Sequence, residues 1–443
     1  MRIPAIRGFD PQAFEKYLKN TGWLMLARVG SLAIKILINN FALSAYLGAA
    51  GFGMYNYPMV IVSFFIAAAA LGLDGFVTRE LLHKPEKKNI LLGTAFGLRV
   101  AAGVLMLPLL YLTYQLLYSF KPLETPFSYI LIAGFTCIIQ SVNIIDSYFQ
   151  SQVKGQKIMY VQVFGNIISA VIKFLFILLK LPLIYFIISY LIDAALIAGA
   201  YLLLYKRDKN QLSDWKFDSR TASYLFKHSW PLAFSAILVS IYMKIDQLMI
   251  ESYLDLTQLG IYSTVVSLSE SWYFIPVAIV TSVFPAIMNA RNMDAERYRK
   301  RLQNLYDLMV VISLCIAVIM TFASDLIYRI AYKPEYWPGA QILSIHIWAG
   351  IFVFLGTASS QYLIAEGYTK LSLIRTAVGA MVNIGLNMLW IPKMGILGAA
   401  LATLAAYAAA TFFLFFIPKT RGQAVMMLKS LFLISLFQKI NTK

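Results

Sequence analysis

Residues 253–262 read YLDLTQLGIY and residues 46–55 read YLGAAGFGMY, so that four of the ten aligned residues are identical. The alignment predicts an internal repeat that divides the chain into two halves of similar length. The longest polar connection, residues 206–229, lies between these halves. Parallel repeats of this kind occur in transporters, in which the substrate site lies between the two copies.

The composition is that of an integral membrane protein. Of the 443 residues, 60% are hydrophobic and only 13% are charged, and the mean hydropathy is +0.69. These values exclude a soluble globular domain. A helix needs about 20 apolar residues to cross ~30 Å of hydrocarbon. Twelve stretches qualify, at approximately residues 22–46, 54–78, 89–118, 127–150, 158–179, 182–205, 230–253, 260–288, 305–331, 339–365, 371–391 and 396–417. We therefore expect an all-α protein with about twelve transmembrane helices.

Six predicted spans precede residues 206–229 and six follow them. Because each half contains an even number of spans, both copies of the repeat cross the membrane in the same direction. This arrangement predicts two parallel six-helix lobes around a central cavity. The N-terminal segment lacks the short apolar core and small-residue cleavage site of a signal peptide. The predicted domains are an interfacial helix at 1–21, a first lobe at 22–205, a cytoplasmic linker at 206–229, a second lobe at 230–418, and a cytoplasmic tail at 419–443 for which a second interfacial helix is one option.

The net charge of +17 has a topological explanation. The two termini and the loops after the even-numbered spans hold 27 Lys and Arg residues, whereas the opposite loops hold only Lys121, Lys180, Lys333 and Lys393. Cytoplasmic loops of membrane proteins are enriched in Lys and Arg, so both termini are predicted to be cytoplasmic. The basic charge therefore requires no nucleic-acid partner. Anionic headgroups of the inner leaflet are its expected contacts.

Four stretches carry a resemblance to a known family. They are YLGAAGFGMYNY (46–57), LGLDGFVTREL (71–81), KIDQLMIESYLDLTQLGIYS (244–263) and NIGLNMLWIPKMGILGAALATLAAY (383–407). Together with the length and the number of spans, they resemble the polysaccharide flippases for O-antigen and other repeat units, in the multidrug/oligosaccharidyl-lipid/polysaccharide exporter superfamily. Such proteins often have a small residue where this chain has Glu251, which leaves the role of Glu251 open.

The resemblance implies a transporter rather than an enzyme. Its implied cargo is an oligosaccharide on undecaprenyl pyrophosphate, moved from the inner to the outer leaflet of a bacterial cytoplasmic (inner) membrane by alternating access. The implied energy source is an H⁺ or Na⁺ gradient, and no other cofactor is expected. Implied partners are membrane lipids and, in the same biosynthetic process, a polysaccharide polymerase and glycosyltransferases.

Polar residues recur at helical spacing inside several predicted spans, which is typical of helices that face a water-filled cavity. One face of the first span carries Arg28, Ser31, Lys35 and Asn39, and one face of the fifth carries Gln162, Asn166, Ser169 and Lys173. Cationic side chains suit a pyrophosphate, because Arg donates paired hydrogen bonds and Lys offers a compact charge. The residues predicted to bind cargo are Arg28, Lys35, Arg99, Lys173, Lys244 and Arg375.

The stretch ILVSIYMKIDQLMI at residues 237–250 places Lys244 and Asp246 two positions apart in a predicted span. At about 100° per residue their side chains lie on different sides of a helix, so they do not pair with each other. We assign Lys244 to the cavity, and Asp246 to a contact between helices or to ion coupling. A carboxylate at membrane depth can take up a proton or hold Na⁺. The candidates for coupling are Asp193, Asp246 and Glu270.

No catalytic or metal-binding motif is found. The histidines His83, His228 and His346 lie in separate segments, and no phosphate-binding glycine loop is present. Two alternatives to the flippase stay open. A cation-coupled multidrug exporter of the same superfamily predicts an anionic pocket for cationic drugs. A membrane-embedded glycan polymerase or ligase predicts a large outer loop, but the outer loops here are at most about ten residues long.

Overall fold

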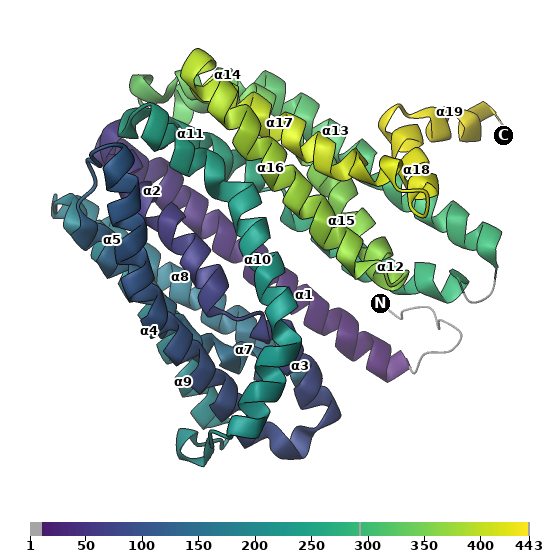
Figure 1. The fold of residues 1–443 in the computed structure, drawn as a ribbon, viewed down its shortest axis with the longest axis horizontal. Helices are drawn as coiled ribbons and strands as arrows, with labels where there is room; N and C mark the ends of the chain where they lie inside the picture. Colours follow the sequence, from purple (N-terminus) through teal and green to yellow (C-terminus); the bar gives the residue numbers. More distant parts are fainter. Residues whose placement is uncertain (1–10, 292–293, 442–443) are drawn as a thin grey trace. The chain divides into compact units, whose positions relative to one another are not determined.

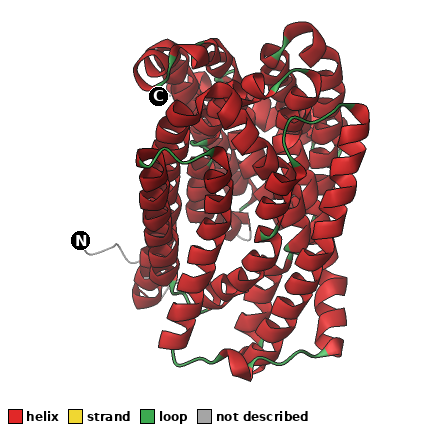
Figure 2. Ribbon diagram, turned by 90° about the vertical axis from the view of Figure 1, so that its left-hand side faces the viewer, coloured by secondary structure: helices red, strands yellow, loops and turns green. Residues whose placement is uncertain are grey.

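The computed structural model describes residues 11–291 and 294–441. Within these ranges the chain forms helices joined by short loops and contains no strand (Figure 1, Figure 2). A helix satisfies its backbone N–H and C=O groups internally, and hydrocarbon offers no replacement for these hydrogen bonds. The prediction of an all-α membrane protein is confirmed.

The α-helices of the first half are α1 (Pro11–Lys35), α2 (Ser44–Ala69), α3 (Leu73–His83), α4 (Lys88–Phe120), α5 (Phe127–Gly134), α6 (Thr136–Ile139), α7 (Ile144–Ser151), α8 (Gly155–Leu178) and α9 (Leu183–Arg207). Those of the second half are α10 (Ser219–Tyr253), α11 (Leu256–Glu270), α12 (Phe274–Arg291), α13 (Ala295–Ala331), α14 (Pro338–His346), α15 (Ala349–Ala365), α16 (Thr369–Met394), α17 (Ile396–Phe412), α18 (Arg421–Leu431) and α19 (Ile434–Asn441).

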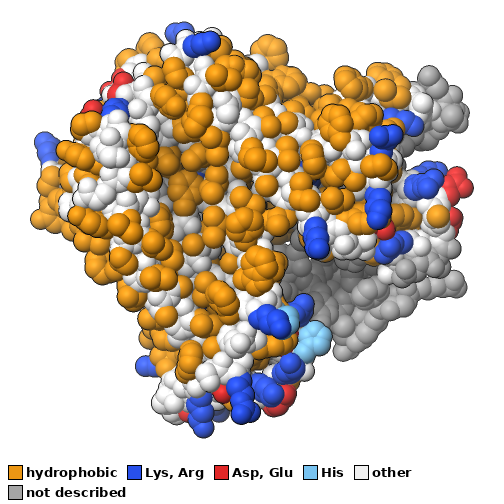
Figure 3. Space-filling view, viewed as in Figure 1, with side chains coloured by type: hydrophobic (Ala, Val, Ile, Leu, Met, Phe, Trp, Pro, Cys, Tyr) orange, Lys and Arg blue, Asp and Glu red, His pale blue; other side chains and the backbone are white. Residues whose placement is uncertain are grey.

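Most of these helices are long and apolar enough to cross a membrane. Among the described residues ten stretches qualify, and α14 with α15, bent by 44°, would make an eleventh span. The first stretch, Lys19–His83, has 65 residues. It would extend about 98 Å as one straight helix, roughly three times the hydrocarbon thickness, so it holds more than one crossing. Hydrophobic side chains are spread widely over the described part of the face shown in Figure 3, as expected of a surface in contact with lipid.

Two interruptions divide this long first stretch. Gly48 has φ +70° and marks a kink inside α2. Leu71 and Gly72 both have positive φ, and they separate α2 from α3. A Cβ on Gly72 would lie 2.5 Å from the backbone nitrogen of Ala233 in α10. Glycine therefore meets two requirements here, the left-handed dihedral and the close approach of α10. This turn positions Asp74 in the first turn of α3.

The contacts divide the chain into two compact units. The first comprises the described residues up to Leu47 together with Met54–Ser240, and the second comprises Gly48–Gly53 together with the described residues from Ile241 onward. The division falls inside α10. The segment between α9 and α10 contacts the first unit, where Trp215 Nε1 donates a hydrogen bond to Tyr205 OH at 3.0 Å. The assignment of residues 206–229 to a cytoplasmic linker stays a prediction.

Each unit has its own packed core. In the first unit α1 lies along α8, α8 along α9, and α3 against α7, around buried residues such as Leu92, Phe149 and Tyr205. In the second unit α16 and α17 form a tight hairpin, and α13 packs against both α14 and α15. Residues 1–10 of the predicted interfacial helix lie outside the described residues, and residues 11–21 begin α1. The predicted tail contains α18 and α19.

Within the second unit, two glycines that are equivalent in the repeat meet face to face. Gly53 and Gly260 occupy the same position of the two aligned stretches. A Cβ on Gly53 would overlap the carbonyl oxygen of Leu256, and a Cβ on Gly260 would overlap that of Ala49. The contact is thus reciprocal, and only glycine permits two backbones to approach so closely. This close contact with α11 explains why Gly48–Gly53 belongs to the second unit.

We predict that Gly53→Ala and Gly260→Ala each lower the melting temperature of the purified protein. The added methyl group must push apart two backbones, which cannot yield as a side chain can, and overpacking of this kind costs about 1–3 kcal/mol or more. Gly385→Ala is the matched control, since nothing lies within 4 Å of a Cβ at Gly385 and alanine favours the helix. Equal melting temperatures for Gly53→Ala and Gly385→Ala would show that the crossing is not close in the folded protein.

Candidate functional site

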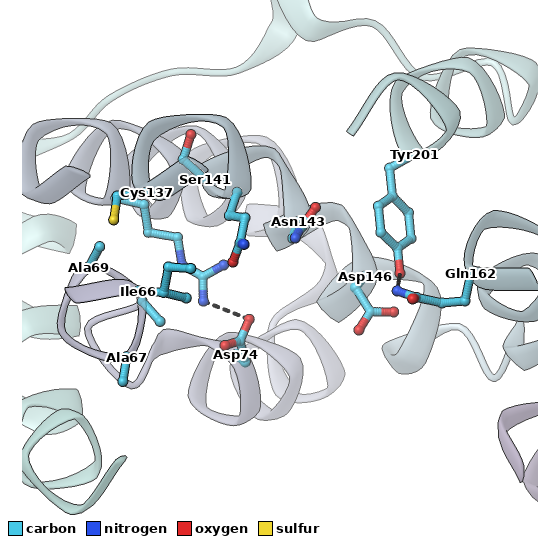
Figure 4. Close-up of a pocket in the computed structure, with 13 residues that line it drawn as sticks. Ile66, Ala67, Ala69, Asp74, Cys137, Ser141, Asn143, Asp146, Gln162 and Tyr201 are labelled. Atoms are coloured by element: carbon cyan, nitrogen blue, oxygen red, sulfur yellow. Dashed lines mark hydrogen bonds and ion pairs between the residues drawn. The ribbon is translucent and has the colours of Figure 1, made fainter. Parts of the chain in front are cut away.

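A polar cavity of about 280 Å³ lies inside the first unit. Its walls come from the end of α2, the start of α3, the middle of α4, the α6–α7 region, α8 and α9 (Figure 4). The polar lining residues are Asp74, Arg99, Gln140, Ser141, Asn143, Asp146, Gln162 and Tyr201. Residues Gln140–Asn143 form a single 3-10 turn. Because side chains three residues apart eclipse in such a turn, Gln140 and Asn143 both line the cavity.

Arg99 is the central cation of this cavity. It is 3% exposed, and its Nη2 lies 2.6 Å from Asp74 Oδ1 (Figure 4). Asp74 is largely exposed, with 62% of its side chain accessible, so it stands at the mouth. Arg99 Nε is buried and makes no hydrogen bond among the described residues. A buried guanidinium with spare donor capacity is unusual, which indicates a site for a polar occupant.

The opposite wall holds a second polar group. Asp146 accepts a hydrogen bond from Gln150 Nε2 at 2.9 Å, and Gln162 Nε2 donates to Tyr201 OH at 3.3 Å (Figure 4). Asn143 Oδ1 is buried without a hydrogen-bond donor in the part of the chain that the structure describes. The cavity therefore offers both unused acceptors and unused donors.

A separate cluster surrounds Lys173 on α8. Lys173 is 3% exposed, and its Nζ donates to Asp193 Oδ2 of α9 at 2.7 Å and to Asn39 Oδ1 at 3.4 Å. Asn39 lies in a π-helical turn, Ile36–Leu43, of the type that often occurs at functional sites. Lys35 lines the same small hollow, and its side chain is exposed. The structure thus brings together Lys35 and Lys173, which were predicted to bind cargo, and Asp193, which was predicted to couple transport to an ion.

The second unit contains a buried network around Asp246 of α10. The carboxylate accepts hydrogen bonds from Tyr262 OH at 2.6 Å and from Thr403 Oγ1 at 3.2 Å. Asn383 Nδ2 donates to Thr403 Oγ1 at 3.5 Å, and Asn387 Nδ2 donates to Asn383 Oδ1 at 2.5 Å. Both asparagines are fully buried. Asp246 therefore joins α10 to α11 and α17, and the predicted contact between helices is confirmed.

Lys244 lies on another side of α10, as the helical geometry predicts. Its Nζ is 3.3 Å from Glu270 Oε2 at the end of α11. Glu270, a predicted coupling residue, is thus the partner of a predicted cargo-binding residue.

The remaining predicted cations are dispersed. Arg375 on α16 is 9% exposed and donates to Ser360 Oγ at 2.7 Å and to Gly356 O at 3.3 Å, both on α15. Arg28 is exposed on α1. Arg99 has its own cavity, apart from the cluster of Lys35 and Lys173. The six cations predicted to bind cargo therefore do not share one cavity within either unit.

Sequence reasoning missed several members of these sites. Tyr262, Asn383 and Asn387 were not predicted, and Thr403 was not recognised as a partner of Asp246. The sequence nevertheless held a signal for Tyr262. The offset of the repeat that aligns 46–55 with 253–262 pairs Tyr262 with Tyr55, and the same offset pairs Asp246 with Asn39. Tyr55 and Asn39 both hydrogen-bond Lys173 in the first unit. The same two positions of the repeat thus build the polar cluster of each unit.

Comparisons with known proteins agree on a family. Residues 43–337 match the family described as Polysaccharide biosynthesis protein, and residues 260–440 match Lipid II flippase MurJ. The chain is 20% identical to the Capsular polysaccharide biosynthesis protein CapF of Staphylococcus aureus, over 87% of this chain and 94% of that protein. It is 22% identical to a Putative O-antigen transporter of Shigella flexneri, over 87% of this chain and 93% of that protein. These matches point to transporters and not to catalytic enzymes.

Solved structures show the same fold. Lipid II flippase MurJ in an inward closed conformation aligns with a TM-score of 0.70 at 18% identity, over 95% of this chain and 93% of that one. An inward-facing multidrug resistance MATE family transporter of the MOP superfamily aligns with a TM-score of 0.74 at 13% identity, over 96% of this chain and 99% of that one. The family match covers more than half of the chain. The chain therefore belongs to the Polysaccharide biosynthesis protein family, and it is a multi-pass membrane protein with the fold of these transporters.

Proposed function

We propose that this protein is a flippase that moves an oligosaccharide linked to undecaprenyl pyrophosphate from the inner to the outer leaflet of a bacterial cytoplasmic membrane by alternating access. The names of the relatives from Staphylococcus aureus and Shigella flexneri support polysaccharide cargo, and that of MurJ supports a lipid-linked one. A polysaccharide polymerase and glycosyltransferases are the proposed partners in the cell.

The cluster of Lys35, Lys173 and Asp193 carries this proposal. Two lysines and one carboxylate give it a formal charge of +1, and Lys35 is exposed. Lys173 is held in place by its bond to Asp193, so Lys35 is the cation available to a mobile ligand. Lys35 carries the positive charge of this cluster that Asp193 does not neutralise, and this charge attracts the negative charge of a pyrophosphate. A multidrug exporter for cationic drugs would need the opposite sign of charge here.

The Asp246 network is the proposed site of coupling to an ion gradient. Asp246 and its partners Tyr262, Thr403, Asn383 and Asn387 supply oxygen atoms from four helices, α10, α11, α16 and α17. Oxygen ligands suit Na⁺, and a buried carboxylate can equally accept a proton. Glu270 and Asp193 each already neutralise a lysine, which makes them weaker candidates than Asp246.

The first test is transport. Protein reconstituted in liposomes with lipid-linked oligosaccharide should expose the sugar to a lectin outside, and Lys35→Ala should reduce the initial rate by roughly tenfold, the effect of losing a charged hydrogen bond of about 1.5–3 kcal/mol. Lys35→Arg should retain most of the rate. Lys333→Ala, in a predicted outer loop, is the control. Equal rates for Lys35→Ala and wild type would remove Lys35 from cargo binding, and no flipping by wild type would refute the proposal.

A double variant can distinguish whether the ion pair of Lys173 and Asp193 serves the stability of the protein or the transport of cargo. Lys173→Met alone leaves a carboxylate without its cation at a buried site and should destabilise the protein by about 3–5 kcal/mol. Adding Asp193→Leu should restore thermal stability, because both charges are then gone. We expect the double variant to fold and to flip cargo slowly. Wild-type flipping by this folded variant would mean that the pair serves structure alone.

Asp246→Asn tests coupling. Asparagine can still accept hydrogen bonds from Tyr262 and Thr403 but cannot carry a charge, so the fold should survive while flipping loses its dependence on an imposed H⁺ or Na⁺ gradient. Asp325→Asn is the control, since Asp325 forms an exposed ion pair with Arg329 at 2.7 Å. A gradient response that persists unchanged in Asp246→Asn would exclude Asp246 from coupling.

A further inference from the structure

We propose that the cavity around Arg99 binds one uncharged sugar residue of the cargo. The inference rests on the proposed function, because it assigns a part of the same lipid-linked oligosaccharide to a second site. It is carried by three properties of the cavity in the first unit: its hydrogen-bonding groups, its shape and its charge.

The hydrogen-bonding groups are those that recognise vicinal hydroxyls. Arg99, Asp146 and Gln162 each carry several polar atoms in one plane. One of these atoms bonds a protein neighbour, which is Asp74, Gln150 or Tyr201, and the others can hydrogen-bond neighbouring groups of a ligand. Arg99 Nε has no acceptor and Asn143 Oδ1 has no donor among the described residues. A sugar hydroxyl both donates and accepts, so one ring could satisfy both atoms at once.

The shape of the cavity also fits a sugar ring. At about 280 Å³ it lies near the lower end of the roughly 300–1,000 Å³ typical of small-molecule sites. One wall is apolar and consists of Ile66, Ala67, Ala69 and Ala70 at the end of α2 (Figure 4). A pyranose has hydroxyls around its edge and C–H groups on its faces, so it matches one apolar wall and a polar periphery.

The charge excludes the head group of the cargo from this cavity. Arg99 is neutralised by Asp74 at 2.6 Å, and Asp146 adds a second carboxylate. The formal charge of the lining is therefore −1, which repels a pyrophosphate or the carboxylate of a uronic acid. Arg99 thus differs from Lys35, because its charge orients hydroxyl groups and does not attract an anion.

The cavity also lies near those ends of the helices that are predicted to face the cytoplasm. Asp74 follows the end of α2, and Asp146 lies in the first turn of α7, the short helix that ends the span Phe127–Ser151. Gln162 is in the first third of α8, and Tyr201 is in the last third of α9. The distribution of Lys and Arg predicts that these ends face the cytoplasm. This is the side from which a flippase loads its cargo.

The test is saturation-transfer NMR on the full chain in nanodiscs, with N-acetylglucosamine and glucuronic acid as probes at millimolar concentration. We expect transfer to the neutral sugar and none to glucuronic acid. Gln162→Leu should weaken binding of the neutral sugar about tenfold, because one or two hydrogen bonds are lost. Gln115→Leu, the control, makes the same change at an exposed site on α4 and should leave the affinity for the sugar unchanged. Ala67→Phe fills the cavity from its apolar wall and should abolish the signal, which gives an independent result if Gln162→Leu does not fold.

The outcomes separate this inference from the proposed function. Absence of transfer to the neutral sugar, equal transfer to glucuronic acid, or wild-type transfer in Ala67→Phe would each overturn the sugar site, even if lipid-linked oligosaccharide is flipped normally. Specific transfer with no flipping would support the sugar site and refute the flippase. Specific transfer with flipping that slows in Ala67→Phe would support both.

Discussion

Hydrocarbon forms no hydrogen bonds, and this single constraint accounts for most of the structure. The helices of this chain meet it, because an α-helix satisfies its backbone hydrogen bonds within one segment. It also explains why charged side chains at membrane depth are paired: Lys173 with Asp193, Arg99 with Asp74, and Lys244 with Glu270. Asp246 forms no ion pair with any residue that the structure describes and accepts several hydrogen bonds instead. Lys35, which lines the hollow beside Lys173, and Arg99, whose Nε makes no hydrogen bond among the described residues, are the groups on which the proposed functions rest.

The fold was largely predictable from sequence because it follows from long-range averages. The positions of the spans depend on runs of about 20 apolar residues, and single substitutions change these runs little. The exposed and buried faces of α10 followed equally well from helical geometry, which placed Lys244 and Asp246 on different sides. The repeat could be recognised from YLGAAGFGMY and YLDLTQLGIY because Gly and Tyr at those positions have structural tasks.

The composition of the sites was less predictable, because it depends on which helices are neighbours. Arg99 and Lys173 were both predicted to bind cargo, which stays a prediction, but the sequence did not indicate that each has a carboxylate partner from a different helix or that they line separate cavities. Asp193 was predicted to couple transport to an ion and Lys173 to bind cargo, although the two are bonded together. Interruptions of the helices also matter. The turn at Leu71 and Gly72 and the 3-10 turn at Gln140–Asn143 aim polar groups into the Arg99 cavity, and no periodicity in the sequence indicates such breaks.

The way α2 and α10 are shared between the two units has a consequence for the evolution of the chain. Although the repeat divides the sequence in two, Gly48–Gly53 from the first copy packs in the second unit, and the first part of α10, up to Ser240, packs in the first unit. Each unit is therefore completed by a segment encoded in the other half of the gene. Two such halves could not separate into independent genes or be exchanged singly between relatives without leaving both units unfinished, so the duplicated halves must evolve as one protein.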